Sequence, residues 1–139
     1  MALFTALAIA GSGMAAEAER LTAVASNIAN ANSVATSAGA AYRAREVVFA
    51  AVPALDSDDE ATTAGMAGVR VVGVVESAAP QRMSYDPGSE FADVNGYVTM
   101  PNVNAVEEMV NMISAQQDYQ ANLEAFNVAK SLALRTLTI

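Results

Sequence analysis

The chain has 139 residues, enough for about one domain, and 31 of them are alanine. It contains no Cys, His or Trp, which excludes a disulfide framework, a zinc finger, and a thiol or Ser-His-Asp catalytic site. The formal net charge of −8 argues against a nucleic-acid binder whose affinity depends on neutralising phosphates. Because alanine buries little area, long packed helices fit this composition better than a thick core.

The first expected element is a helix from about residue 3 to residue 31. Apolar residues recur in it at sevenfold spacing, as in a coiled coil. One seam is formed by Leu7, Met14, Leu21 and Ile28, and the alternate seam by Leu3, Ala10, Val24 and Ala31. Each Gly of Gly11-Ser12-Gly13 costs about 1 kcal/mol relative to Ala, so we expect this helix to need a packing partner.

The first ten residues could pass for a secretion signal because they are apolar and contain small residues. However, no Lys or Arg precedes Arg20, so the positively charged start of a signal is missing. The apolar run ends at Gly11, which is too early to span a bilayer. We therefore expect these residues to belong to the first helix, with no cleavage and no membrane span.

An amide-rich run, Ser26 to Ser33, follows within the predicted helix and at its end. Asn is a poor interior helix former and a good terminator, which predicts that the helix ends near Asn32. A second interpretation adds amides that bond neighbouring chains, with Asn27 and Asn30 on one helical face. Both remain open at this point.

The middle of the chain changes to β-branched and aromatic runs bounded by turn formers. The predicted strands are Val47 to Phe49, Val69 to Val75 and Tyr97 to Thr99, and the predicted turns are Asp86-Pro87-Gly88 and Asn95-Gly96. We expect residues 54–68 to form a flexible loop, because they are rich in Ala, Asp, Thr and Gly.

No constellation of residues predicts catalysis. The acidic run that starts at Asp56 lacks the Gly and Glu of an EF-hand loop at its sixth and twelfth positions, which are Ala61 and Ala67. A solvated loop explains the run better than calcium does. We predict no catalytic residue, no cofactor-binding site and no metal site.

The last predicted element is a second helix, capped by Asn104 and running from Ala105 to Ile139 without Gly or Pro. Its apolar stripe comprises Met109, Met112, Ile113, Tyr119, Leu123, Phe126, Leu134 and Leu137. Gln116, Gln120 and Asn127 interrupt the stripe. They either face solvent or set the register of a helix interface.

The predicted fold class is therefore mainly α with a small β insert, in which long N- and C-terminal helices form a coiled-coil-like pair. We expect three parts: residues 1–33 as the N-terminal helix, 34–101 as a β-rich insert containing the loop 54–68, and 102–139 as the C-terminal helix.

The motifs resemble the rod proteins of the bacterial flagellar basal body, and among them the proximal-rod members. The resemblance covers essentially the whole chain and is weakest over 54–68. Its motifs are Ser26-Asn27-Ile28-Ala29-Asn30-Ala31-Asn32-Ser33, Tyr42-Arg43-Ala44-Arg45, Tyr85-Asp86-Pro87-Gly88, Gly96-Tyr97-Val98, Pro101-Asn102-Val103-Asn104, Glu107 to Ile113, Tyr119-Gln120-Ala121-Asn122 and Lys130.

The resemblance implies a structural subunit that self-associates and assembles with other rod proteins and with the adaptor to the membrane ring. It also implies export through the flagellar type III apparatus without a cleaved signal, and a location in the rod that crosses the periplasm. Slender helices that bury little alone agree with this, since heterologous contacts that do not close generate filaments. The alternative function is a soluble helical binding module or an export chaperone.

The predicted subunit interface draws on both helices. Its residues are Leu7, Met14, Leu21, Asn27, Ile28, Asn30, Asn32, Met109, Ile113, Tyr119, Asn122, Leu123, Phe126 and Leu134.

Overall fold

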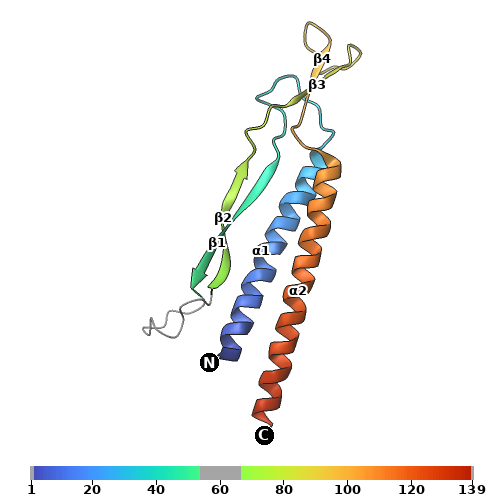
Figure 1. Ribbon diagram of the computed structural model, residues 1–139. Helices are drawn as coiled ribbons and strands as arrows, with labels where there is room; N and C mark the ends of the chain where they lie inside the picture. The colour runs from blue at the N-terminus through green and yellow to red at the C-terminus, as the bar shows by residue number, and fades with distance from the viewer. Residues whose placement is uncertain (1, 54–66, 139) are drawn as a thin grey trace. The chain divides into compact units, whose positions relative to one another are not determined.

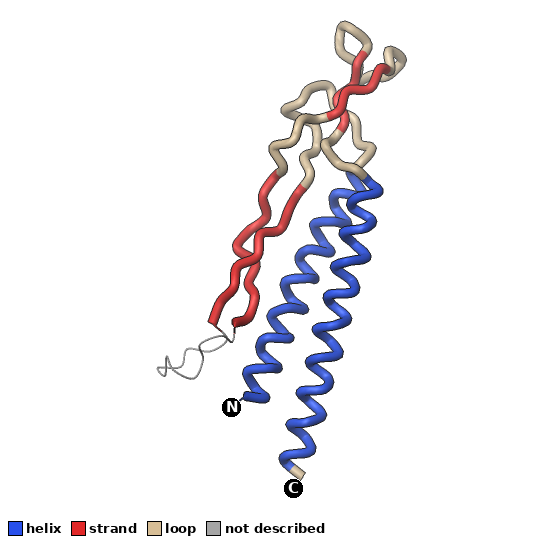
Figure 2. Tube along the Cα trace, viewed as in Figure 1, coloured by secondary structure: helices blue, strands red, loops and turns tan. Residues whose placement is uncertain are grey.

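The computed structural model describes residues 2–53 and 67–138 (Figure 1). Its elements, in chain order, are α1 (Ala2–Asn30), β1 (Arg45–Pro53), β2 (Ala67–Glu76), β3 (Arg82–Tyr85), β4 (Tyr97–Met100) and α2 (Ala105–Leu137). Figure 2 shows the same order, with one helix at each end of the chain and the strands between them. The prediction of two long helices around a small β segment is confirmed.

The strands form two separate two-stranded sheets, β1 with β2 and β3 with β4. In the second sheet the strands are antiparallel, with Arg82 opposite Met100 and Tyr85 opposite Tyr97. An isolated antiparallel bridge joins Ala35 to Thr99 of β4. Three of these strands contain the predicted β-branched runs. The fourth, β3, was not predicted because its four residues lack that signal.

Some boundaries differ from the expectation. Ala67 and Gly68 begin β2, whereas the sequence placed them at the end of a loop. The first helix ends at Asn30, two residues before Asn32. The rest of the predicted loop, which contains the acidic run at Asp56, lies outside the described residues.

The chain divides into two compact units. Unit 1 comprises residues 1–21, 47–73 and 113–139, and unit 2 comprises 22–46 and 74–112. Unit 1 therefore holds most of α1, most of β1 and β2, and most of α2. Unit 2 holds the end of α1, the β3–β4 sheet and the first turns of α2.

The core of unit 2 is small. Ala31, Ala44 and Val103 form a buried cluster against which Tyr42 and Ala105 pack. Alanine contributes two of the three buried members, and this limits the area that burial can stabilise.

Unit 1 is packed mainly with small residues. The buried positions of α1 in this unit are Thr5, Ala10, Gly13 and Ala16. The seam Leu7, Met14 and Leu21 is half-buried instead. Small residues let backbones approach closely, and the larger side chains lie at the edge of the contact.

Candidate functional site

The most constrained polar side chain is Asn27, in the last turn of α1, which is 1% exposed. Its Nδ2 donates to the carbonyl oxygen of Arg45 and to Oε2 of Glu108, both at 2.9 Å. Its Oδ1 accepts from the Arg45 N–H at 2.8 Å and from the Tyr42 hydroxyl at 2.9 Å. An amide has two donors and an oxygen with two lone pairs, so every position is used.

These four bonds link three segments that are distant in sequence: the end of α1, the first residue of β1 and the first turn of α2. Asn27 pairs with both backbone groups of Arg45, as a neighbouring strand would. The bond to Glu108 is charge-assisted and is the stronger kind. We call Asn27, Tyr42, Arg45 and Glu108 the amide node.

Ser26 completes the node. Tyr42 has one hydroxyl proton and gives it to Asn27, so Ser26 Oγ is the donor in its 3.1 Å bond to the Tyr42 oxygen. The guanidinium of Arg45 lies 5.8 Å from the Tyr42 ring centre, within cation–π range.

A second amide, Asn102, acts in the same way within unit 2. Its Oδ1 accepts from the Ala44 N–H at 2.8 Å, and its Nδ2 donates to the carbonyls of Ser77 and Ala79 at 3.2 and 2.9 Å. Arg82 then donates to the Val103 carbonyl at 3.3 Å. Side chains therefore satisfy the backbone groups of segments that belong to no sheet.

In unit 1, Ser12 and Gly13 form a packing site, and the segment Gly11-Ser12-Gly13 does not interrupt α1. Ser12 Oγ donates to the Ile9 carbonyl at 2.7 Å and accepts the Val69 N–H of β2 at 3.1 Å. A Cβ built on Gly13 would lie 2.8 Å from the side chain of Asn122 in α2. The small residues thus allow both β2 and α2 to approach this turn of α1.

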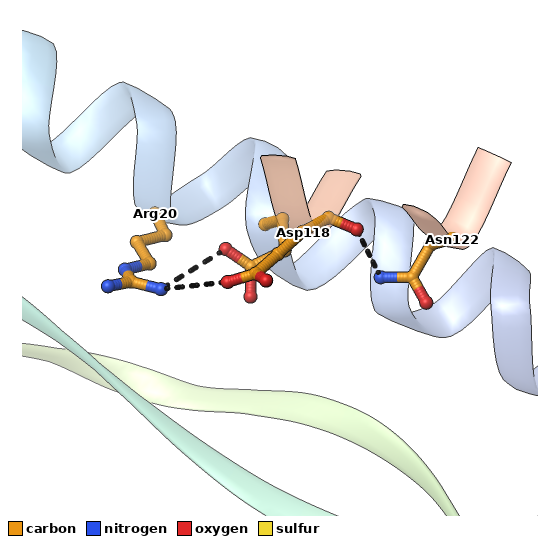
Figure 3. Close-up of polar contacts among 4 residues, drawn as sticks. Arg20, Asp118 and Asn122 are labelled. Carbon is orange, nitrogen blue, oxygen red and sulfur yellow. Dashed lines mark hydrogen bonds and ion pairs between the residues drawn. The ribbon is translucent and has the colours of Figure 1, made fainter. Parts of the chain in front are cut away.

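Arg20 lies between two carboxylates (Figure 3). Its Nη1 is 3.5 Å from Glu17 on α1 and 3.7 Å from Asp118 on α2. Burial raises the pKa of the Glu17 carboxyl above its ordinary value of 4.5; Arg20 opposes this shift, and the negative charge of Asp118 adds to it. Glu17 lines a groove of about 340 Å³ together with Phe49 and Asn122.

The predicted interface residues fall into three exposure groups. Asn27 is buried. The half-buried group comprises Leu7, Met14, Leu21, Ile28, Asn30, Tyr119, Asn122 and Phe126. The exposed group comprises Asn32, Met109, Ile113, Leu123 and Leu134. The interrupting amides Gln116, Gln120 and Asn127 are exposed as well.

The structure brings Asn27 into the amide node, and Asn30 bonds back to the Ser26 carbonyl at 2.9 Å. The sequence analysis assigned no bonding role to Asn102, Arg82, Ser12 or Glu108. Glu108 is the first-turn acid of α2 that bonds Asn27, while Glu107 is exposed. The adjacent pair of acids was the sequence signal for this site, but Asn27, the partner of Glu108, lies 81 residues away in sequence.

Large apolar side chains gather on the surface of α2. Of its 33 residues, all described by the structure, only Ala115 and Ala129 are buried. The exposed large residues are Val106, Met109, Val110, Ile113, Leu123, Val128, Leu132, Leu134 and Leu137. We call them the apolar surface of α2.

The described part of the chain has neither a metal-binding cluster nor a membrane-spanning helix. Its His, Cys, Asp and Glu side chains form no group of three or more that could hold a metal ion. Neither α1 nor α2, over the residues described, is both long enough and apolar enough to cross a membrane.

Comparison with known proteins points to one family. Residues 7–38 match the family model described as flagella basal body rod protein, and residues 94–139 match that described as flagellar basal body rod FlgEFG protein C-terminal. Flagellar basal-body rod protein FlgC of Salmonella typhimurium is 49% identical over 139 residues, covering 100% of this chain and 98% of the relative. The proteins of the same name from Escherichia coli O157:H7 and Borreliella burgdorferi are 48% and 34% identical, with the same coverage.

Proposed function

Because the chain belongs to the FlgC family of flagellar basal-body rod proteins, a structural family, we propose that it polymerises into the proximal rod. In this proposal it assembles with its own copies, with other rod proteins and with the adaptor to the membrane ring, and the rod crosses the periplasm as a drive shaft. The binding module or export chaperone has no support among the relatives named above, which are rod proteins.

The apolar surface of α2 is the observation that carries the proposal. A helix of 33 residues with two buried positions does not bury enough of its own surface to account for its apolar content. Exposed apolar residues that gather on one element mark a site of protein contact. Neighbouring subunits that cover α2 would supply the missing burial.

We propose that the two terminal helices are the rod core and pair as in a coiled coil, with residues 1–33 and 102–139 in the core and 34–101 as the insert. Contacts between the helices in each unit support this. Asn122 lies against Gly13 in unit 1, and Glu108 bonds Asn27 in unit 2. The half-buried seam of α1 would then complete its burial against other subunits.

Asn27 has a different role in this proposal from the exposed predicted residues. Its amide is fully used inside one subunit. It would therefore shape the interface by fixing α1 against α2. Exposed residues such as Ile113 and Leu134 would contact neighbours directly.

Export through the type III apparatus without signal cleavage is part of the proposal. Thr5 and Ala10 are buried in unit 1, and the Ile9 carbonyl accepts a bond from Ser12. Cleavage after Ala8 or Ala10 would remove residues on which this packing depends. Mass spectrometry of the assembled protein should find these residues present, and a chain beginning after Ala10 would contradict this route.

The assembly proposal is tested by placing a charge on the apolar surface. Leu123→Asp should abolish incorporation into basal bodies, because it would bury a charge in a packed contact. Leu123 is already 40% exposed in the subunit, so the unfolding free energy of the monomer should change little. Leu123→Met keeps an apolar side chain of similar volume at the same position and is the matched control.

Basal bodies isolated from cells that express each variant would be probed for the chain, and swimming would be scored in the same strains. Incorporation of Leu123→Met but not Leu123→Asp supports the proposal. Equal incorporation of both variants would show that the apolar surface of α2 is not part of the assembly contact.

A further inference from the structure

The turn between β3 and β4 carries a second exposed apolar surface, which the proposed function does not use. We call residues 83–97 the acidic tip. Its exposed large residues are Met83, Tyr85, Phe91, Val94 and Tyr97. Val94 is the extreme case, at 101% exposure. The tip thus displays apolar side chains that its own subunit does not cover.

The acidic tip is held in shape by its own bonds. Tyr85 and Tyr97 are paired in register, with ring centres 5.2 Å apart in an edge-to-face arrangement. Asp93 Oδ1 accepts the N–H groups of Asn95 and Tyr97 at 2.8 and 2.9 Å. Gly96 adopts φ of 84°, which side chains other than glycine rarely tolerate. A partner would therefore meet a surface that is already ordered.

The charge of the tip is entirely negative. Asp86, Glu90 and Asp93 are exposed, and residues 83–97 contain no Lys or Arg. A complementary surface would combine cations with apolar residues, because charges across an interface are arranged to match.

The last turns of α2 have this chemistry. Residues 125–138 contain Lys130 and Arg135 and no acid. Their exposed apolar residues are Val128, Leu132, Leu134 and Leu137. Val128, Leu132 and Arg135 also line a shallow hollow of about 280 Å³. We call residues 125–138 the basic end of α2.

The other cations of the chain are less suited. The Arg45 guanidinium lies over the Tyr42 ring and next to Glu46 in sequence. Arg82 and Arg43 donate to the carbonyls of Val103 and Ser77. Arg70 is the single cation of β2. Arg20 lies between two carboxylates. The basic end of α2 therefore offers the clearest match in the described chain.

We propose that the acidic tip of one copy docks on the basic end of α2 of a second copy, with a tip side chain such as Phe91 in the shallow hollow. The two surfaces differ, so the contact is heterologous: each bound pair leaves one free tip and one free basic end. The inference deepens the proposed polymerisation and rests on it, since it names one contact between subunits.

Cysteine cross-linking tests the contact, because the chain has no Cys of its own. Cells would co-express a Val94→Cys chain and an epitope-tagged Leu134→Cys chain, and isolated basal bodies would be oxidised. We expect a disulfide-linked dimer of one tagged and one untagged chain. Val72→Cys, exposed on β2 and outside both surfaces, replaces Leu134→Cys as the matched control.

Charge reversal gives the second readout in the same preparation. Lys130→Glu with Arg135→Glu in the tagged chain should lower the cross-linked yield by about tenfold, since like charges that face each other across a contact repel and a tenfold change corresponds to about 1.4 kcal/mol. Asp86→Lys with Glu90→Lys in the untagged partner should restore it. High salt should reduce both effects by screening.

The outcomes separate this inference from the proposed function. If the chains are present in basal bodies but Val94→Cys links Leu134→Cys no more than Val72→Cys, the docking is overturned while the rod function stands. A loss of yield that the reciprocal charges do not restore would also overturn it. If the wild-type chain is absent from basal bodies, the proposed function itself fails.

Discussion

Asn27 is buried with all four hydrogen-bonding positions of its amide filled, which makes it the most sensitive single residue in unit 2. Asn27→Ala would leave both backbone groups of Arg45 and the Glu108 carboxylate without this partner. Each buried polar group left unpaired costs about 1–3 kcal/mol. Because water can enter and bond some of these groups, we expect the free energy of unfolding to fall by about 2–4 kcal/mol.

Denaturant unfolding of the full chain measures this loss. Asn30→Ala is the control, because Asn30 is half-buried and its amide donates only to the carbonyl of Ser26 in its own helix. That change should cost less than about 1 kcal/mol. Equal losses of unfolding free energy for the two variants would show that the bonds of the amide node contribute no more than one bond within a helix.

Glu17 makes stability depend on pH in a direction opposite to that of most acids. Its pKa is raised above 4.5 by burial, so between the two pKa values the folded chain binds more protons than the unfolded chain. The contribution of Glu17 to the free energy of unfolding is therefore fully present below about pH 4.5 and falls as the pH rises through the raised pKa.

Glu17→Gln should remove this penalty. We expect its melting temperature to exceed that of the wild type at pH 7, and the two to converge near pH 4, where Glu17 is protonated. Thermal melts across this range check it, with the exposed Glu19→Gln as control. A lower melting temperature for Glu17→Gln at pH 7 would mean that the pairing with Arg20 outweighs burial.

At the scale of elements, the sequence predicted both helices and three of the four strands from periodicity and β-branched runs. Both seams of the first helix were predicted, but the depth at which each residue is buried was not. The seam of large residues such as Leu7 and Met14 is half-buried, while Ala10 and Ala16 are buried. Periodicity identifies a face, but the depth of burial depends on how closely a partner approaches, and small residues allow the closest approach.

The amide node could be predicted only in part, because its bonds join distant segments. The sequence singled out Asn27 as unusual for a helix interior. It gave no sign that the partners would be Arg45 and Glu108, since no local pattern encodes a contact over 81 residues. Asn102 was missed for the same reason: its side chain bonds irregular backbone at Ser77 and Ala79.

The two glycines of α1 offer a matched pair at this scale. A Cβ on Gly11 would meet no atom within 4 Å, whereas one on Gly13 would lie 2.8 Å from Asn122. Gly11→Ala should therefore stabilise the chain by about 0.5–1 kcal/mol through helix propensity. Gly13→Ala should gain less or lose stability, because Asn122 must leave its 3.0 Å bond to the Asp118 carbonyl.

A double-mutant cycle decides whether Asn122 is the cause. In an Asn122→Ala background, Gly13→Ala should recover the full gain of Gly11→Ala, measured by denaturant unfolding. If Gly13→Ala remains unfavourable there, another contact limits α1 at this turn.

At the scale of the whole molecule, the described chain satisfies its buried polar groups but not its apolar surface. No buried side-chain nitrogen or oxygen among the described residues lacks a partner. The apolar residues of α2, by contrast, are largely exposed. The buried polar side chains described thus have their partners within one subunit, whereas the exposed apolar residues of α2 would be buried only by neighbouring subunits.

This imbalance predicts that the end of α2 folds stably only on assembly. Most of the stability of a helix in a protein comes from tertiary packing, and residues 125–138 contain a single buried residue, Ala129. Hydrogen exchange on the monomer should therefore be fast over 125–138 and slow at the Ala44 and Arg45 amides, which bond Asn102 and Asn27. In assembled rods both regions should be protected. Slow exchange along all of α2 in a verified monomer would show an independently folded module, and the exposed apolar residues would then need an explanation other than folding coupled to assembly.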